Sequence, residues 1–247
     1  MTRDLLWRGM LAGILAALLA TLFARAFAEP SIDLAIGVEH AEAAHHAAMP
    51  GMDMPKAAPE EDLVSRDTQK SWGLATALAL YGAAVGGVFS LVFAYGYGRF
   101  SALGPRSLSL LLAALAFALL VVVPALKYPQ TPPAVGRHET VALRTAAYFA
   151  MIALSLGAAV VAARLRSAFA RGGRGFDATL LAVGVFALIV GAGQFALPTI
   201  DEVPADFPAT LLWNFRVASM ATQALLWATI GIAFGIWAER VLKRAAA

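Results

Sequence analysis

One short segment of the sequence combines histidine, glutamate and methionine side chains, all of which can bind metal ions. It contains Glu39, His40, Glu42, His45, His46, Met49, Met52 and Met54. If residues 38–48 form a helix, Glu42 and His46 lie four residues apart on one face, with His45 at three-residue spacing. Imidazole nitrogen binds cobalt, nickel, copper and zinc in proteins. The segment is therefore predicted to contact a transition metal, as a flexible capture region rather than as a rigid site.

The methionines leave the identity of that metal open. Thioether sulfur favours Cu(I), whereas cobalt(II) favours nitrogen and oxygen ligands. Without any metal, the same residues would form a solvated polar loop whose ligands are incidental. The chain has no cysteine, so thiolate zinc sites, iron–sulfur clusters and disulfides are excluded.

A second set of polar side chains lies around a proline-rich connection between two apolar stretches. Its members are Gln194, Asp201, Glu202, Asp206 and Arg216. Arg216 lies about one helical turn inside its apolar stretch, where an arginine needs a partner or a water-filled cavity. These residues predict a polar cluster near the outer end of a translocation route. The alternative is a set of interhelical bonds that only fixes a helix bundle.

The composition shows which elements must carry these residues. Of the 247 residues, 60% are hydrophobic and 14% are charged, whereas soluble domains have roughly 45–50% apolar and about 25% charged residues. A helix needs about 20 mostly apolar residues to cross a bilayer. Six stretches fit: Leu5–Ala28, Trp72–Tyr97, Leu108–Leu126, Val141–Ala163, Ala178–Leu197 and Leu211–Ala238. We expect an all-α integral membrane protein, a bundle of six transmembrane helices with a long first outer loop.

The positions of the basic residues predict the orientation of this bundle. The termini and the even-numbered connections carry Arg3, Arg8, Arg99, Arg106, Arg164, Arg166, Arg171, Arg174, Arg240, Lys243 and Arg244. The odd-numbered connections carry only Lys56, Arg66, Lys70, Lys127 and Arg137. Because positive residues stay on the cytoplasmic side, both termini are expected there, and residues 29–71 on the periplasmic side. The net charge of +3 therefore reflects topology and gives no reason to expect a nucleic-acid partner.

The first apolar stretch allows two interpretations. Residues 26–28 read Ala-Phe-Ala, which resembles a signal-peptidase site, and cleavage there would leave five spans. We favour retention, because the stretch is long and Gly9 and Gly13 offer a packing face. The expected division is 1–28 as first transmembrane helix or signal anchor, 29–71 as outer loop, and 72–247 as a five-helix membrane bundle.

Glycines spaced four residues apart occur in three of the stretches. The pairs are Gly9/Gly13, Gly82/Gly86 and Gly231/Gly235. Such pairs let two helix backbones approach closely. They predict close packing, either inside the bundle or with a helix of a partner or a second copy.

Signatures of enzymatic chemistry are absent from the sequence. It contains no Walker A motif, no G-x-S-x-G and no H-E-x-x-H, and no histidine pair lies within the spans to hold haem. We therefore expect neither an enzyme nor a resident cofactor.

Two proline-bearing blocks identify a family that the chain resembles. They are Lys127-Tyr128-Pro129 with Pro132-Pro133-Ala134-Val135-Gly136, and Asp201-Glu202-Val203-Pro204 with Phe207-Pro208 and residues 211–216 (Leu-Leu-Trp-Asn-Phe-Arg). Together with a first span that ends in a glutamate- and histidine-bearing segment, they resemble the CbtA family, a proposed cobalt transporter subunit. The resemblance covers nearly the whole chain. Met49, Met52 and Met54 depart from the family pattern.

The resemblance implies a bacterial inner-membrane permease subunit for divalent transition-metal uptake, with Co²⁺ as the first candidate, in the service of cobalamin synthesis. It also implies a small companion with one span and a histidine-bearing end, CbtB. In this interpretation His40, His45, His46, Glu39 and Glu42 collect the metal, and Asp201–Asp206 guide it to the bundle. The alternatives are a copper-handling membrane protein, which the methionines suggest, and a non-transporting metal-binding or scaffold module.

Overall fold

The fold is a bundle of long helices. The computed structural model describes residues 2–47, 74–99, 103–133, 135–170 and 175–246, and no strand occurs among them. Its α-helices are α1 (Thr2–Phe27), α2 (Glu29–Ala47), α4 (Leu74–Gly96), α5 (Pro105–Phe117), α6 (Val123–Ala125), α7 (Val141–Phe169), α8 (Gly175–Ala196) and α9 (Ala209–Ala246). A π-helical turn, η2 (Ala118–Val122), joins α5 to α6, and a 3₁₀ turn, η3 (His138–Thr140), precedes α7.

Six helical stretches in the described part of the chain are long and apolar enough to cross a membrane. They are Thr2–Phe27, Thr76–Gly96, Pro105–Ala125, Val141–Phe169, Gly175–Ala196 and Ala209–Ala245. They coincide with the six predicted spans to within a few residues at most ends, so the predicted all-α membrane bundle is confirmed. The chain is a multi-pass membrane protein.

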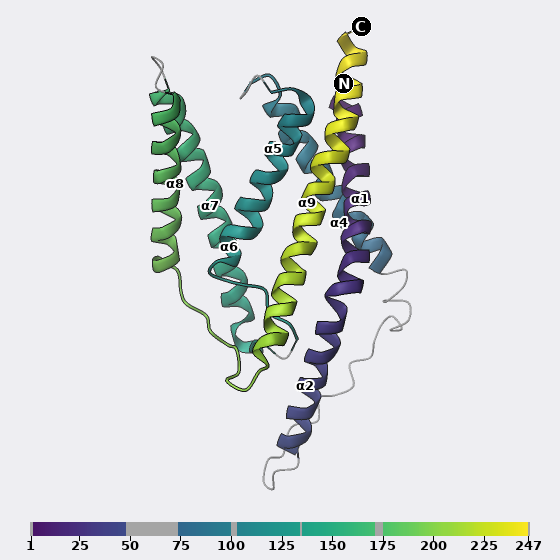
Figure 1. The fold of residues 1–247 in the computed structure, drawn as a ribbon, viewed down its shortest axis with the longest axis vertical. Coiled ribbons are helices and arrows are strands. Elements are labelled where there is room, and N and C mark those ends of the chain that lie inside the picture. Colours follow the sequence, from purple (N-terminus) through teal and green to yellow (C-terminus); the bar gives the residue numbers. More distant parts are fainter. Residues whose placement is uncertain (1, 48–73, 100–102, 134, 171–174, 247) are drawn as a thin grey trace.

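The two ends of the bundle differ in character. Both termini lie at one end, the terminal end (Figure 1). The opposite end carries two connections that are rich in proline, residues 126–137 and 197–208, which we call the proline loops. The second set of predicted polar residues therefore gathers at the end opposite to the termini.

Close backbone contact joins α1 to α4. A Cβ atom on Gly13 would lie 1.8 Å from the carbonyl oxygen of Gly82, and one on Gly86 would lie 2.0 Å from that of Gly9. Only glycine permits this approach, since any side chain would overlap the neighbouring backbone. The predicted packing role of these two glycine pairs is confirmed, and the faces meet each other inside the chain.

Helix α9 packs between α1 and α5 and completes the largest apolar core. The third glycine pair belongs to this contact, because a Cβ on Gly231 would lie 2.7 Å from that of Ala113 on α5. The buried Ser109 hydroxyl donates to the Gly231 carbonyl at 2.8 Å. Phe234 packs edge-to-face against Phe89 and Phe93 of α4, with ring centroids 5.5 and 5.0 Å apart.

A proline explains the π-helical turn at the end of the third span. Pro124 has no N–H, and its ring clashes with the carbonyl four residues earlier in a regular α-helix. The helix therefore widens by one residue at this turn, and the Val123 N–H bonds to the Ala118 carbonyl, five residues earlier. Two hydroxyls of α7 bond carbonyls beside this defect: Ser155 donates to Leu119 at 2.6 Å and Tyr148 donates to Leu120 at 3.3 Å. In a bilayer no water can satisfy such carbonyls, so these bonds fasten α7 to the third span.

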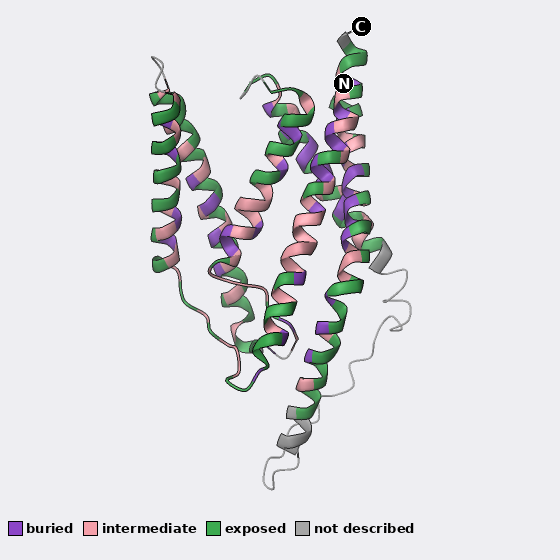
Figure 2. Ribbon diagram, viewed as in Figure 1, coloured by how far each residue is buried: buried purple, intermediate pink, exposed green. Residues whose placement is uncertain are grey.

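Helices α7 and α8 form a hairpin that stands beside the other spans (Figure 1). Met151 and Ala158 of α7 and Val190 of α8 are buried together with Val123 of α6. Figure 2 shows the buried residues on inward-facing stripes and exposed ones around the outside of the bundle. The exposed surface includes large apolar residues, such as Leu188 at 73% and Phe195 at 93%, which suits contact with lipid.

The predicted outer loop after the first span begins as a helix. Helix α2 follows α1 after Ala28 and extends beyond the proline-loop end of the bundle (Figure 1). The condition posed for residues 38–48 is met at positions 38–47, and position 48 lies outside the described residues. Ala35 is fully buried against Val135, Phe207 and Leu211, with Val38 packed at the edge of the same cluster. The first half of α2 thus rests on both proline loops.

Candidate functional site at the proline-loop end

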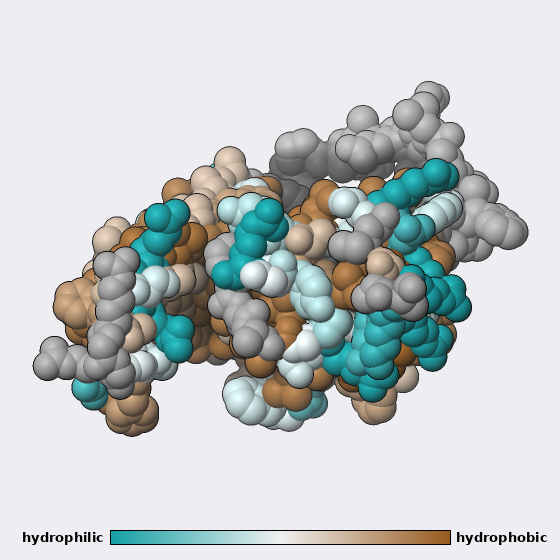
Figure 3. Space-filling model, turned by 90° about the horizontal axis from the view of Figure 1, so that it is seen from above, coloured by the Kyte–Doolittle hydropathy of each residue, from teal (hydrophilic) through white to brown (hydrophobic). Residues whose placement is uncertain are grey.

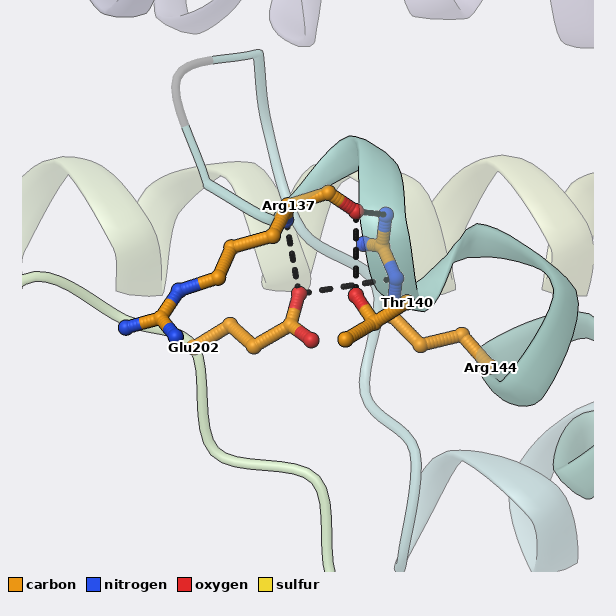
Figure 4. Close-up of polar contacts among 4 residues, drawn as sticks. All are labelled: Arg137, Thr140, Arg144 and Glu202. Atoms are coloured by element: carbon orange, nitrogen blue, oxygen red, sulfur yellow. Dashed lines mark hydrogen bonds and ion pairs between the residues drawn. The ribbon is translucent and has the colours of Figure 1, made fainter.

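A carboxylate on the second proline loop is the centre of the best-defined polar contact at this end. Glu202 Oε2 accepts a hydrogen bond from the backbone N–H of Arg137 at 2.9 Å and lies 3.5 Å from Arg144 Nε (Figure 4). The Glu202 side chain is only 10% exposed and that of Arg144 is 32% exposed. The arginine also donates from Nη2 to the Arg137 carbonyl at 3.3 Å. Glu202 therefore clasps the two proline loops together.

Glycine and proline positions create the geometry of this clasp. Gly136 has a φ of +119°, a backbone conformation that side-chain-bearing residues rarely adopt. A Cβ atom there would also lie 2.2 Å from Arg144 Nη1. The guanidinium therefore lies where only glycine leaves room. Prolines on both sides prevent either loop from continuing a helix, and this keeps the segments extended as they meet.

The surroundings of Glu202 favour its charged form. The pKa of this carboxyl is lowered from 4.5 chiefly by a hydrogen bond from the Thr140 hydroxyl and then by the Arg137 N–H. Burial opposes this in part, and the charges of Arg144 and Arg137 add smaller lowering effects. In the present rotamer the single Thr140 proton goes to the Arg137 carbonyl at 2.9 Å, and rotation about the C–O bond turns it to the carboxylate. The Glu202 carboxylate is thus negatively charged, with Arg137 and Arg144 positioned to stabilise that charge.

Two further contacts fasten the first proline loop, one to the second loop and one to the end of α8. The Tyr128 hydroxyl donates to the Pro198 carbonyl at 2.7 Å. Lys127 Nζ donates to the backbone carbonyl of Gln194 at the end of α8. The structure thus uses the main chain of Gln194, whereas the sequence had suggested its side-chain amide. The two loops form one polar platform.

The other members of the predicted cluster lie apart from the clasp. Arg216 is half-buried, and its Nε donates to the Gln130 carbonyl at 3.3 Å. No contact of Arg216 with the three carboxylates occurs among the described residues. Asp201 and Asp206 are exposed on the second proline loop. The structure therefore pairs Glu202 with Arg144 and leaves the two aspartates open to solvent.

The predicted metal ligands lie on α2 or beyond it. Glu39 and His40 are exposed on this helix. Glu42, His45 and His46 also lie in α2, but their side chains, like Met49, Met52 and Met54, are outside the described residues. Within the described part of the chain, no three His, Asp or Glu side chains come together to hold a metal ion.

An apolar cavity of about 780 Å³ lies among α4, α5, α7 and α9. Its walls are mostly leucine, valine and phenylalanine, and the polar groups among them include Tyr81, Gln130, Tyr148 and Gln223. Trp227 also lines it, and its indole N–H is buried without a hydrogen-bond partner in the described structure. Because Gln130 belongs both to this lining and to the contact with Arg216, the cavity reaches the proline loops.

Sequence reasoning missed several residues of the platform. From the sequence, no role there was assigned to Arg137, Thr140 or Arg144. Gly136 could have indicated this contact, since a glycine between valine and arginine in a proline-rich loop suggests a special backbone conformation. No sequence pattern could have indicated the cavity, because its lining residues come from four separate spans and have the same composition as lipid-facing residues.

Comparisons with known proteins give one family. No curated protein and no solved structure matches the chain. A family model described as "Probable cobalt transporter subunit (CbtA)" matches residues 2–239.

Proposed function

Since the chain belongs to the CbtA family of probable cobalt transporter subunits, we propose that it is the membrane permease subunit of a system for uptake of divalent cobalt. The proposal includes a bacterial inner-membrane location with both termini in the cytoplasm, as the positions of the basic residues suggest. The proline-loop end then faces the periplasm. The imported metal serves cobalamin synthesis, and no resident cofactor is needed.

One observation supports the proposal above the others: nitrogen and oxygen ligands are held exposed at a single end of the bundle. The Glu202 clasp fixes the loop that presents Asp201 and Asp206. The packing of Ala35 on Phe207 and Leu211 brings α2, with exposed Glu39 and His40, to the same platform. Cobalt(II) favours such ligands, and several weak sites in series let an ion bind and still leave.

A companion subunit completes this proposal. The cavity below the platform is lined mainly by apolar side chains, which cannot replace the hydration shell of a divalent cation. The family description as a subunit implies a complex. We expect a small single-span, histidine-bearing companion of the CbtB type to supply polar groups that the bundle lacks.

Uptake of radioactive cobalt by cells tests the proposal. Cells that express the chain with its companion should accumulate more label than cells that lack both, and equal accumulation would refute it. Asp201→Asn/Asp206→Asn should raise the external cobalt concentration needed for half-maximal uptake. Asp177→Asn, at an exposed carboxylate in the first turn of α8, is the matched control and should leave uptake unchanged.

Flux into proteoliposomes separates this proposal from its rivals. Co²⁺, Ni²⁺, Cu⁺ and Zn²⁺ are offered one at a time to the purified complex. Preference for Cu⁺ that disappears on replacing Met49, Met52 and Met54 would favour copper handling. Metal binding with no flux of any ion would favour a scaffold or delivery module.

A further inference from the structure

A second cavity, of about 490 Å³, lies between the first and last spans near the terminal end. It is lined by Trp7, Arg8 and Leu11 of α1 and by Trp237, Arg240 and Arg244 of α9. On α9 the three residues are separated by three and four positions, so they share one face of the helix. The volume lies within the range of about 300–1,000 Å³ that is usual for ligand-binding clefts.

The acids near this cavity are fewer than its arginines, and the ion pairs formed in the described part of the chain involve other basic residues. Glu239 binds Arg106 of α5 at 2.6 Å and Lys243 at 3.4 Å. Arg8 donates from Nη1 to the backbone carbonyl of Asp4 at 3.1 Å, which leaves its charge uncompensated by this contact. Within the described part of the chain, Arg240 and Arg244 form no ion pair. The Asp4 carboxylate, one turn from Arg8, is the one other acid on these helix ends, against three guanidinium groups.

The cavity joins this positive charge to an apolar wall. Trp7 is 58% exposed and Leu11, one turn deeper in the span, is 48% exposed. Tryptophan is enriched where membrane proteins meet the lipid headgroups, and both helices contribute one here. Seen from the terminal end, hydrophilic side chains gather over the ends of α1 and α9, beside hydrophobic surface (Figure 3). A ligand of this cavity must therefore be anionic at one end and apolar at the other.

We propose that this cavity binds the phosphate headgroup of an anionic phospholipid. Guanidinium groups bind phosphate through paired charge-assisted hydrogen bonds, and basic pockets between transmembrane helices hold anionic headgroups in the adjacent leaflet. Inorganic phosphate has the same anionic chemistry but no apolar part to contact Trp7 and Leu11. The acyl chain of a phospholipid covers both side chains. A bound lipid joins the first span to the last and stabilises their contact.

Thermal unfolding of the purified full-length chain in a neutral detergent tests this proposal. The probes are phosphatidylglycerol, phosphatidylcholine and inorganic phosphate. Phosphatidylglycerol should raise the midpoint temperature saturably, and the other two should not. Arg240→Gln/Arg244→Gln should weaken the apparent affinity for phosphatidylglycerol about tenfold or more, because hydrogen bonds to two charged donors are lost.

A matched double variant controls for net charge. Arg164→Gln/Arg166→Gln removes the same charge from the same end of the bundle, on α7, and should bind phosphatidylglycerol like the wild type. Native mass spectrometry of the folded fraction measures bound lipid directly, so reduced folding of a variant does not obscure the result. Equal lipid binding by the two double variants would overturn the proposal. Equal stabilisation by inorganic phosphate would overturn the assignment to a lipid.

Discussion

Glu202 and Arg144 show how a single ion pair holds the second proline loop in place. The pair joins the first turn of α7 to the loop before α9, and the Arg137 N–H adds a bond from the first proline loop, so the two exposed aspartates of the second loop are presented on a fixed backbone. The sequence predicted Glu202 as a member of a polar cluster, because it is one of the three acids nearest along the chain to Arg216. It could not identify the partner, since Arg216 is nearer along the chain and only the tertiary fold brings Arg144 to the carboxylate.

The lowered pKa of Glu202 predicts a pH-dependent effect. Because the folded state holds this carboxylate charged, its contribution to stability is present at neutral pH and is lost as pH falls through the lowered pKa. Glu202→Gln should lower the midpoint of thermal unfolding at pH 7, and the difference from wild type should shrink below the ordinary value of 4.5. Asp201→Asn, at the exposed neighbour, should leave the midpoint unchanged at both pH values. A pH-independent difference for Glu202→Gln would contradict this reasoning.

Gly136 predicts a second effect at the same place. Gly136→Ala should destabilise the protein by about 1–3 kcal/mol, the usual range for a residue in a sparsely populated backbone region, and should also displace Arg144. Gly98→Ala is the control, because Gly98 has a φ of +76° but open space around it. Chemical denaturation in detergent measures both variants. We expect Gly136→Ala to lose more free energy of unfolding than Gly98→Ala. Equal losses would show that the overlap with Arg144 makes no further contribution to the destabilisation.

At the scale of elements, the sequence predicts the long apolar helices but not the irregular turn within one of them. Length and hydropathy were enough to place six spans, because a bilayer demands long apolar helices. The glycine pairs also predicted close packing, although the sequence could not say which faces meet. The π-helical turn at Ala118–Val122 was not predicted. Pro124 indicates that the α-helical hydrogen bonding is interrupted, but it does not specify which groups of neighbouring helices bond the freed carbonyls.

The glycine contact between α1 and α4 predicts a strong steric effect. Gly13→Leu places side-chain atoms on the backbone of Gly82, and the helices must separate. We expect destabilisation at or beyond the upper end of the 1–3 kcal/mol typical of overpacking, seen as a reduced monodisperse fraction in size-exclusion chromatography. Gly157→Leu, on α7 with open space around it, should behave like the wild type.

The fastening of α7 to the third span predicts the effect of a single hydroxyl. Ser155→Ala leaves the Leu119 carbonyl without its 2.6 Å donor, and interhelical bonds in membrane proteins contribute about 0.6 kcal/mol on average and up to about 1.7. A loss in the upper part of this range is expected in unfolding experiments. Ser167→Ala removes a hydroxyl that bonds only the Ala163 carbonyl of its own helix. It should have little effect, and equal losses would contradict the interhelical role.

At the scale of the whole molecule, the six spans of the described part of the chain form a bundle with unlike ends. One end carries the termini and the arginines of the second cavity, and the other carries the proline loops and α2. The placement of the termini opposite the proline loops could be predicted from the sequence, because successive connections lie at alternate ends once the six spans are counted. The cavity among α4, α5, α7 and α9 could not, because it depends on how far the α7–α8 hairpin stands from the other spans.

The absence of cysteine makes the orientation directly measurable. His40→Cys on α2 and Arg164→Cys on α7 each introduce the only thiol of the chain. A membrane-impermeant maleimide should label His40→Cys in intact cells with a permeable outer membrane, and Arg164→Cys only after the inner membrane is opened. The reverse pattern would invert the proposed topology and put the proline loops in the cytoplasm.

The shared location of the two chain ends has a consequence for how the protein can be extended. Six spans return the chain to the side from which it started. Any single additional span joined in frame to α9 changes that parity, and its far end emerges beside the proline loops. A one-span companion could thus be tethered covalently with its free end at the acid-bearing platform, and such a fusion would fix a one-to-one stoichiometry by connectivity alone.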